Sequence, residues 1–143
     1  MGRRVRRRDE RAVSAIEMSI VAPVFLLLIF VVVQASLWFY GRNVALSAAR
    51  EGASHLRLAA VTSDSAGYAG YEAVAEDTAL QYADGVGMLS GTHARAVIDE
   101  GSDTATMEVG GTVIDLIPGW DLDVERTLTV RVERFRPDEG PTE

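Results

Sequence analysis

The spacing of hydrophobic and polar positions changes along the chain, and each change marks a different kind of element. From Met18 to Tyr40 there are 23 residues without a formal charge, including the unbroken apolar stretch VFLLLIFVVV. A helix of that length, at about 1.5 Å per residue, would extend roughly 35 Å, enough to cross a hydrocarbon core of about 30 Å. The run therefore predicts a transmembrane helix.

Helical spacing continues beyond this run, but the apolar positions become small. They recur at intervals of three and four residues, as on one face of a helix: Ala45, Ala48, Ala49, Gly52, Leu56 and Ala59. Such a stripe lets another helix or a sheet approach closely. One helix from Val13 to about Val61 would be roughly 73 Å long. Pro23 removes one backbone hydrogen bond and is expected to bend or locally loosen that helix.

A second helix is predicted after a loop. Residues 62–70, TSDSAGYAG, form the expected loop, and an amphipathic helix is expected from about Tyr71 to Asp84. Its buried face is expected to contain Tyr71, Val74, Ala75, Thr78, Ala79 and Tyr82. Glu72, Glu76 and Asp77 are expected on the opposite face.

Beyond Gly91 the apolar spacing changes to two, which indicates β-strands. The expected inward positions are Ala94, Ala96 and Ile98, then Ala105, Met107 and Val109, then Leu128, Val130 and Val132. The segment 99–103 predicts a hairpin, and 110–123 a longer connection. The predicted fold class is α+β: a long N-terminal transmembrane stem helix, a second amphipathic helix, and a small three-stranded antiparallel sheet packed on the stem.

Charge divides the chain into parts. Residues 1–12 contain six Arg against two acids, residues 13–42 are neutral overall, and the remainder holds seven Arg against 18 acids. Basic residues directly before a membrane span hold that end in the cytoplasm, and this position disfavours the other interpretation, a nucleic-acid-binding arm. We expect a cytoplasmic basic leader at 1–12, a transmembrane segment at 13–42, an extracytoplasmic domain at 43–136 and a disordered tail at 137–143.

Two other interpretations of the apolar segment stay open. A cleaved secretory signal could end at Val33-Gln34-Ala35, although its apolar core would be long for a signal and the hydrophobic pattern continues past that point. A plain uncleaved anchor explains length and orientation equally well. It leaves Glu17 unexplained, because an ionisable residue at a membrane segment is costly and suggests a function by default.

Glu17 has a candidate partner if the chain is cut between Ala12 and Val13. The cut would make Glu17 the fifth residue of the mature protein and give Val13 a new ammonium group. In a bundle of like helices, the carboxylate of one subunit would then neutralise the ammonium of its neighbour. The pair would set the axial register, since a wrong register leaves a buried charge unpaired.

This arrangement resembles the class III signal of type IV pilin-like proteins, and it is most similar to the TadE-like minor pilins of tight-adherence (Tad, or Flp) pili. The resemblance rests on Ala12 before the scissile bond and on Glu17, Met18 and Pro23 at the family's spacings after it. Ala12 replaces the usual Gly, and Met18 stands where Phe is common. The stretches WFYGRNVALSAAREGA (38–53) and VERFRP (132–137) extend the resemblance.

The resemblance implies a pilin-like domain and a minor pilin or pseudopilin that a prepilin peptidase cuts between Ala12 and Val13. The subunit would enter a pilus or related secretion filament through its N-terminal helix. Implied partners are membrane lipid, the prepilin peptidase, other pilins of the same system, and separate assembly ATPase and platform proteins. The implied location is the cytoplasmic membrane, single-pass with the N-terminus in the cytoplasm, and ultimately a cell-surface pilus.

No catalytic chemistry is predicted. The chain contains no cysteine and only two histidines, His55 and His93, at no spacing typical of a zinc protease or a triad, and each is interpreted as a surface or packing residue. It has no glycine-rich phosphate loop. We therefore expect no enzyme activity, no cofactor, no metal site and no nucleic-acid partner.

A rival hypothesis from another class is an uncleaved single-pass membrane protein whose acidic extracytoplasmic domain binds a ligand or an envelope partner. The acidic residues that bear on it are Asp99, Glu100, Asp103, Asp121 and Asp123. Solvated turns explain them, and their spacing matches no EF-hand, but calcium binding by these loops stays open.

Overall fold

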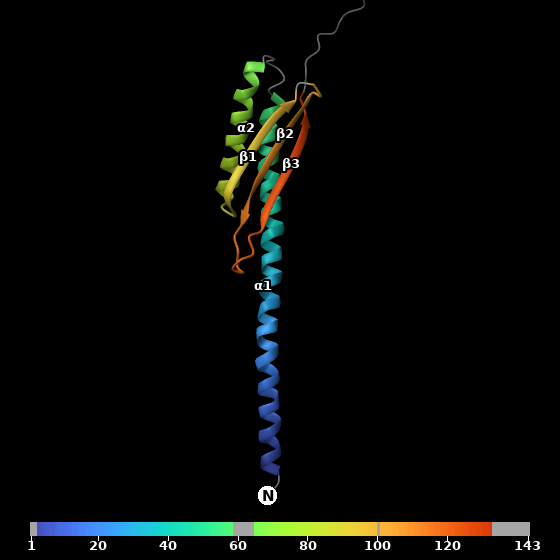
Figure 1. Cartoon of the computed structure of the whole chain (residues 1–143), viewed down its shortest axis with the longest axis vertical. Coiled ribbons are helices and arrows are strands. Elements are labelled where there is room, and N and C mark those ends of the chain that lie inside the picture. Colours follow the sequence, from blue (N-terminus) through green and yellow to red (C-terminus); the bar gives the residue numbers. More distant parts are fainter. Residues whose placement is uncertain (1–2, 59–64, 100, 133–143) are drawn as a thin grey trace, which may run out of the picture. The chain divides into compact units, whose positions relative to one another are not determined.

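The computed structural model describes residues 3–58, 65–99 and 101–132; within these ranges the side chains of 3–14, 58 and 65–67 are not described. The elements, in chain order, are α1 (Arg3–Leu58), α2 (Ser65–Val86), β1 (Leu89–Asp99), β2 (Thr104–Val113) and β3 (Asp123–Arg131) (Figure 1). The predicted α+β class, with a long N-terminal helix, a second helix and three strands, is confirmed. Ala59, Val61 and the predicted tail lie outside the described residues.

The boundaries of the second helix differ from the prediction. Residues 65–70, expected in a loop, form the first turns of α2, so the loop prediction is wrong from Ser65 onward. Glycine and serine disfavour a helix only modestly, and serine is favoured at a helix N-terminus. The composition of TSDSAGYAG therefore could not distinguish a loop from the start of a helix. At the other end α2 continues past Asp84 to Val86.

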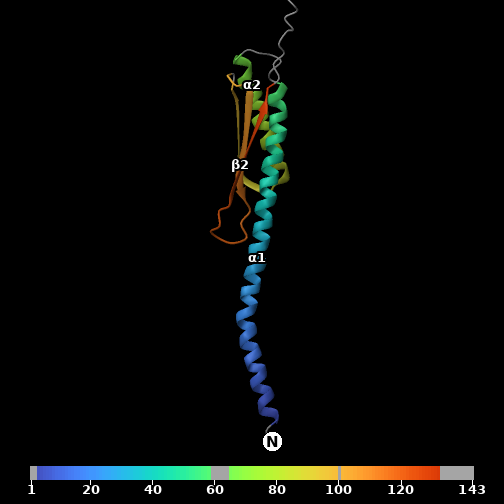
Figure 2. The ribbon, with the colours of Figure 1, turned by 90° about the vertical axis from the view of Figure 1, so that its right-hand side faces the viewer.

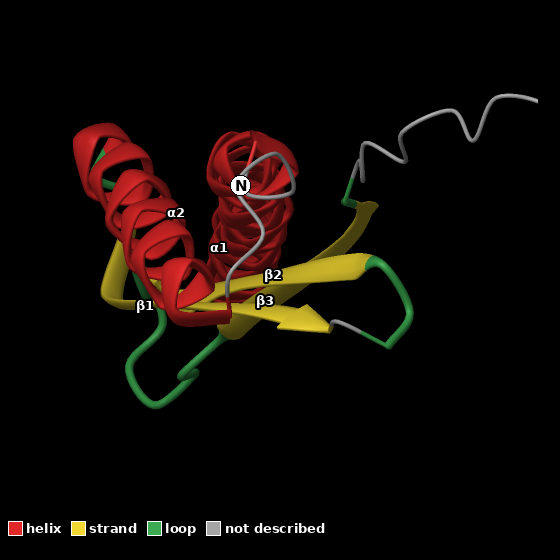
Figure 3. Ribbon diagram, turned by 90° about the horizontal axis from the view of Figure 1, so that it is seen from above, coloured by secondary structure: helices red, strands yellow, loops and turns green. Residues whose placement is uncertain are grey.

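Contacts divide the chain into two compact units, Met1–Ser36 and Leu37–Glu143. The second unit holds the last turns of α1, the helix α2 and the sheet, which lies alongside that part of α1 (Figure 2). Viewed from above, α1 and α2 both cover one face of the sheet (Figure 3). Neither of these helices covers the opposite face of the sheet (Figure 3).

The sheet is antiparallel with the order β1-β2-β3. Asp99 pairs with Thr104, which confirms the hairpin predicted at 99–103. The Asp99 carboxylate accepts hydrogen bonds from the Ser102 hydroxyl at 2.7 Å and the Gly101 amide at 2.9 Å. These two bonds, the hydroxyl first, lower the pKa of Asp99. The longer connection is shorter than expected, because β2 extends to Val113 and β3 begins at Asp123.

The main core forms where the sheet meets the two helices, as the small-residue stripe predicted. It contains Ala48, Ala49, Ala53 and Leu56 of α1, Ala75, Ala79 and Ala83 of α2, and Ala96, Ala105, Met107, Val109, Val130 and Val132 of the sheet region. Gly52 shows how close the packing is. A Cβ atom there would lie 2.7 Å from the Ala75 carbonyl oxygen and 3.0 Å from the Met107 methyl group.

The buried face of α2 matches the prediction only in part: Ala75 and Ala79 were predicted to be buried, and Ala83 was not. Ala75, Ala79 and Ala83 are fully buried, whereas Val74 and Tyr82 are 50% and 42% exposed. Close packing selects the alanines, since a larger side chain would hold the helix away from α1 and the sheet.

Glu72 and Glu76 are also misplaced by the prediction. Glu72 accepts a hydrogen bond from the Ile98 amide and Glu76 one from the Ala96 amide, each at 2.8 Å. These amides belong to the edge strand β1, and amides on an unpaired strand edge require an acceptor. Both glutamates therefore serve the sheet edge instead of facing water on the far side of α2.

Replacing Gly52 by alanine is expected to lower the free energy of unfolding by roughly 1 to 3 kcal/mol, because the new Cβ overlaps the backbone of α2. Gly70→Ala is the matched control, since a Cβ there meets nothing within 4 Å. It should leave stability unchanged or raise it by about 0.5 to 1 kcal/mol, as for alanine in a helix. Urea unfolding of the detergent-solubilised full chain, followed by tryptophan fluorescence, measures both. Equal stability of Gly52→Ala and wild type would show that α1 and α2 are not in this close contact.

Candidate functional site in the N-terminal helix

Between residues 16 and 33, α1 exposes large apolar side chains on every side. Large hydrophobic side chains at least 40% exposed follow one another around it: Ile16, Met18, Ile20, Val21, Val24, Phe25, Leu26, Leu27, Leu28, Ile29, Phe30, Val32 and Val33. A helix that is apolar all round belongs in lipid or among other helices. Within the described residues, α1 is the single helix long and apolar enough to cross a membrane, over Ala15–Arg57.

The predicted cleavage and register residues all lie on this helix. Ala12 and Val13 belong to its helical backbone, and the Glu17 side chain is exposed. Val13 and Glu17 are four residues apart, so they lie on the same face and roughly 6 Å apart along the axis. Glu17 makes no ion pair with the side chains that the structure describes. The cleavage and register roles stay predictions.

Pro23 lies inside α1 without ending it. Proline has no amide hydrogen, so the Ser19 carbonyl lacks its usual partner one turn later. Two serine hydroxyls of this stretch donate within the helix: Ser19 to the Ala15 carbonyl and, roughly four turns beyond Pro23, Ser36 to the Val32 carbonyl, each at 2.8 Å. Backbone and hydroxyl groups bonded inside one helix are what an apolar environment requires.

The aromatic end of the predicted span also belongs to the folded domain. Leu37 and Trp38 pack on a second buried cluster formed by Val44, Ala45, Leu89, Val113 and Val124. The Arg42 guanidinium carbon lies 4.5 Å from the Trp38 ring centroid, a cation–π contact. At Gly41 a Cβ would lie 2.6 Å from the Val113 side chain. Leu37, Trp38 and Gly41 therefore contact the folded domain, while Phe39 and Tyr40 are exposed.

The acidic turns considered for calcium do not form one site. Asp99 pairs with Thr104 at the start of β2, and Asp123 pairs with Thr112 near its end. Eight residues of extended strand separate them by roughly 27 Å. Asp99 is also already engaged in its own turn, and Glu100 lies outside the described residues.

The two histidines differ in their surroundings. His55 is partly buried on α1, whereas His93 is exposed on β1 beside Glu108 of β2 and Glu125 of β3. Sequence analysis missed this cluster, because its members are separated by up to 32 positions and meet only through the strand register. The one signal available was that all three occupy outward positions of the alternating pattern.

Comparison with known proteins points to the same N-terminal region. Residues 12–54 match the family model described as TadE-like protein. The matched segment begins at Ala12, contains Glu17 and Pro23, and ends just after Ala53, so it covers the apolar helix and most of the small-residue stripe but neither α2 nor the sheet. No curated protein and no solved structure matches the chain.

Proposed function

We propose that this chain, a TadE-like protein by its residues 12–54 and hence associated with Tad pili, is a minor pilin or pseudopilin of a Tad-type pilus or related secretion filament. A prepilin peptidase cuts it between Ala12 and Val13, and it enters the filament through α1. The observation that carries the proposal is the apolar, uncovered stretch of α1 at residues 16–33, whose one carboxylate, Glu17, lies five residues after the start of the family match.

The exposed apolar surface of α1 requires two successive environments. In the membrane, lipid covers it; in a filament, the helices of other subunits replace the lipid. Transfer between the two changes little for the apolar side chains, because both surroundings are apolar. It matters greatly for Glu17, since an isolated ionised carboxylate is strongly disfavoured in such surroundings. The new ammonium group of a neighbour's Val13 supplies the compensating charge.

The charge distribution supports an orientation for the membrane form. Six arginines precede the apolar run, and residues 43–143 hold 18 acids against seven arginines. The N-terminus is accordingly cytoplasmic and the α+β domain extracytoplasmic. Since the sequence has no phosphate-binding loop, energy for assembly comes from a separate ATPase acting through platform proteins.

Processing is tested first at Ala12. Ala12→Leu should block cleavage by overfilling a peptidase pocket shaped for a small side chain, whereas Ala12→Gly should be cut at least as well as wild type. Intact mass of the protein purified from cells with an active prepilin peptidase measures each form, and mature protein should begin at Val13. If wild type, Ala12→Leu and Ala12→Gly all keep residues 1–12, the chain is the rival single-pass protein with an acidic binding domain.

Assembly is tested at Glu17. Glu17→Val should still insert and largely still be cut, but it should be lost from the sheared surface fraction. An unpaired ammonium would enter an apolar bundle, and breaking a buried ion pair typically costs on the order of 3 to 5 kcal/mol. That corresponds to roughly a hundredfold to several thousandfold in the partition between membrane and filament.

Two further variants separate charge from shape at this position. Glu17→Gln keeps size and hydrogen bonding without charge and should fall between wild type and Glu17→Val. Leu27→Met is the matched control, a conservative apolar change elsewhere in the same apolar stretch, and should assemble normally. The amount of mature protein in the membrane fraction and in the sheared surface fraction, measured for each variant, tests the pairing mechanism. Wild-type amounts of Glu17→Val in the sheared fraction would contradict the pairing mechanism.

A further inference from the structure

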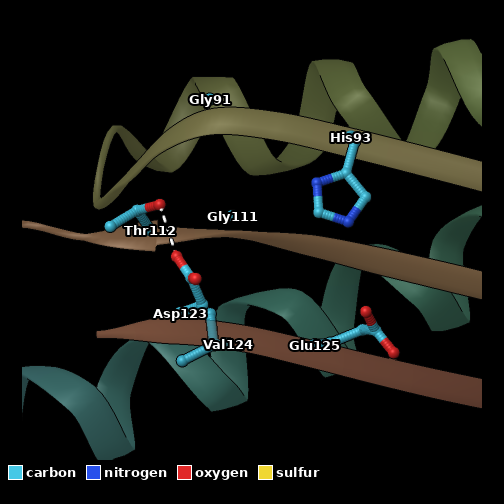
Figure 4. Close-up of a pocket in the computed structure, with 7 residues that line it drawn as sticks. All are labelled: Gly91, His93, Gly111, Thr112, Asp123, Val124 and Glu125. Atoms are coloured by element: carbon cyan, nitrogen blue, oxygen red, sulfur yellow. Dashed lines mark hydrogen bonds between the residues drawn. The ribbon is translucent and has the colours of Figure 1, made fainter. Parts of the chain in front are cut away.

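The face of the sheet turned away from the helices brings three metal-ligating side chains together. His93 of β1, Glu108 of β2 and Glu125 of β3 have ligand atoms that all lie within 4.8 Å of one another. In Figure 4 the His93 ring and the Glu125 carboxylate lie on the same side of the sheet, with β2 between their strands. Three adjacent strands thus each contribute one ligand.

Gly110 makes this convergence possible. His93 and Glu125 are both register partners of Gly110, one from each side of β2. A Cβ at Gly110 would lie 2.5 Å from both Cε1 and Nε2 of the His93 ring. The imidazole therefore occupies the space that a side chain on the central strand would fill, which extends its nitrogen towards β3.

The backbone of β1 also contributes to the placement of His93. The register between β1 and β2 shifts between Ser90 and His93, and Gly91 has a φ of 60°. A bulge of this kind re-aims the following side chains, and bulges are frequent next to functional sites. Gly91 permits the bulge, because a left-handed φ is unfavourable for most other residues.

Space for a bound ion and its water ligands lies beside the cluster. A cleft of about 280 Å³ is lined by Gly91, His93, Gly111, Thr112, Asp123, Val124 and Glu125. Asp123 accepts a hydrogen bond from the Thr112 hydroxyl at 2.7 Å, so its carboxylate is held at the rim. Arg95 pairs in register with Glu108, and this cationic residue lies on the same face of β1 as His93.

We propose that His93, Glu108 and Glu125 form a binding site for a divalent transition-metal ion of the Zn²⁺ type. One imidazole and two carboxylates suit Zn²⁺, whereas Ca²⁺ and Mg²⁺ prefer oxygen ligands alone. Tetrahedral ligands at about 2.0 to 2.1 Å from zinc lie roughly 3.3 Å apart. Small rotations of the two glutamate side chains close the remaining gap. The site does not depend on the proposed role in a filament.

The test is Zn²⁺ binding by the full chain in detergent micelles, without a polyhistidine tag, measured by equilibrium dialysis with metal analysis. Wild type should bind one Zn²⁺ per chain at this site, and Zn²⁺ should raise the midpoint of thermal unfolding. His93→Gln and Glu125→Gln should each weaken binding by at least roughly the 10- to 100-fold that loss of an outer-shell partner causes. His55→Gln removes the other histidine and should bind as wild type.

Gly110→Ala provides a variant in which every ligand is retained. Its Cβ displaces the His93 ring, so binding should fall by roughly 10-fold or more. Circular dichroism establishes that each variant is folded. The proposal is overturned if wild type binds no Zn²⁺, if His93→Gln and Glu125→Gln bind as tightly as wild type, if His55→Gln is the variant that loses binding, or if Ca²⁺ displaces Zn²⁺ at equal concentration.

Discussion

The close approach of α1 to the sheet and to α2 is the constraint on which the folded domain depends. At Gly41 and Gly52 the neighbouring groups come so near that a single methyl group would overlap them. Alanines fill the positions between, and neither alanine nor glycine loses side-chain rotamer freedom when it is buried. The contact therefore combines dense packing with a low entropic penalty, and it leaves no void that a mutation to a larger residue could fill.

The side chains of α1 differ in character between its two parts. From residue 16 to residue 33 it exposes large apolar side chains on all sides. From Leu37 on, its buried side is narrow and made of small residues, and arginines and other polar groups take the remainder. The TadE-like match covers both parts. The match ends before α2 and the sheet.

The elements governed by periodicity were predictable, and those governed by contact between distant segments were not. Alternation indicated the inward residues of all three strands correctly, because one face is buried along their whole length. For α2 the same reasoning chose Val74 and Tyr82 over Ala83, since hydrophobicity does not reveal how near a neighbouring backbone lies. The cluster around His93 required the register, the bulge and the missing side chain of Gly110 together, and none of these is visible in local sequence.

The hydrogen bonds from β1 amides to Glu72 and Glu76 make the two edges of the sheet different. They occupy outward amides of β1, so a strand from another chain would have to displace two carboxylates to pair there. The other edge, β3, has no helix of the described chain bonded along it in this way. Strand addition at the β1 edge is thus opposed by these two carboxylates. Two copies of the domain would not extend each other's sheets through a pair of β1 edges, which removes one route to aggregation.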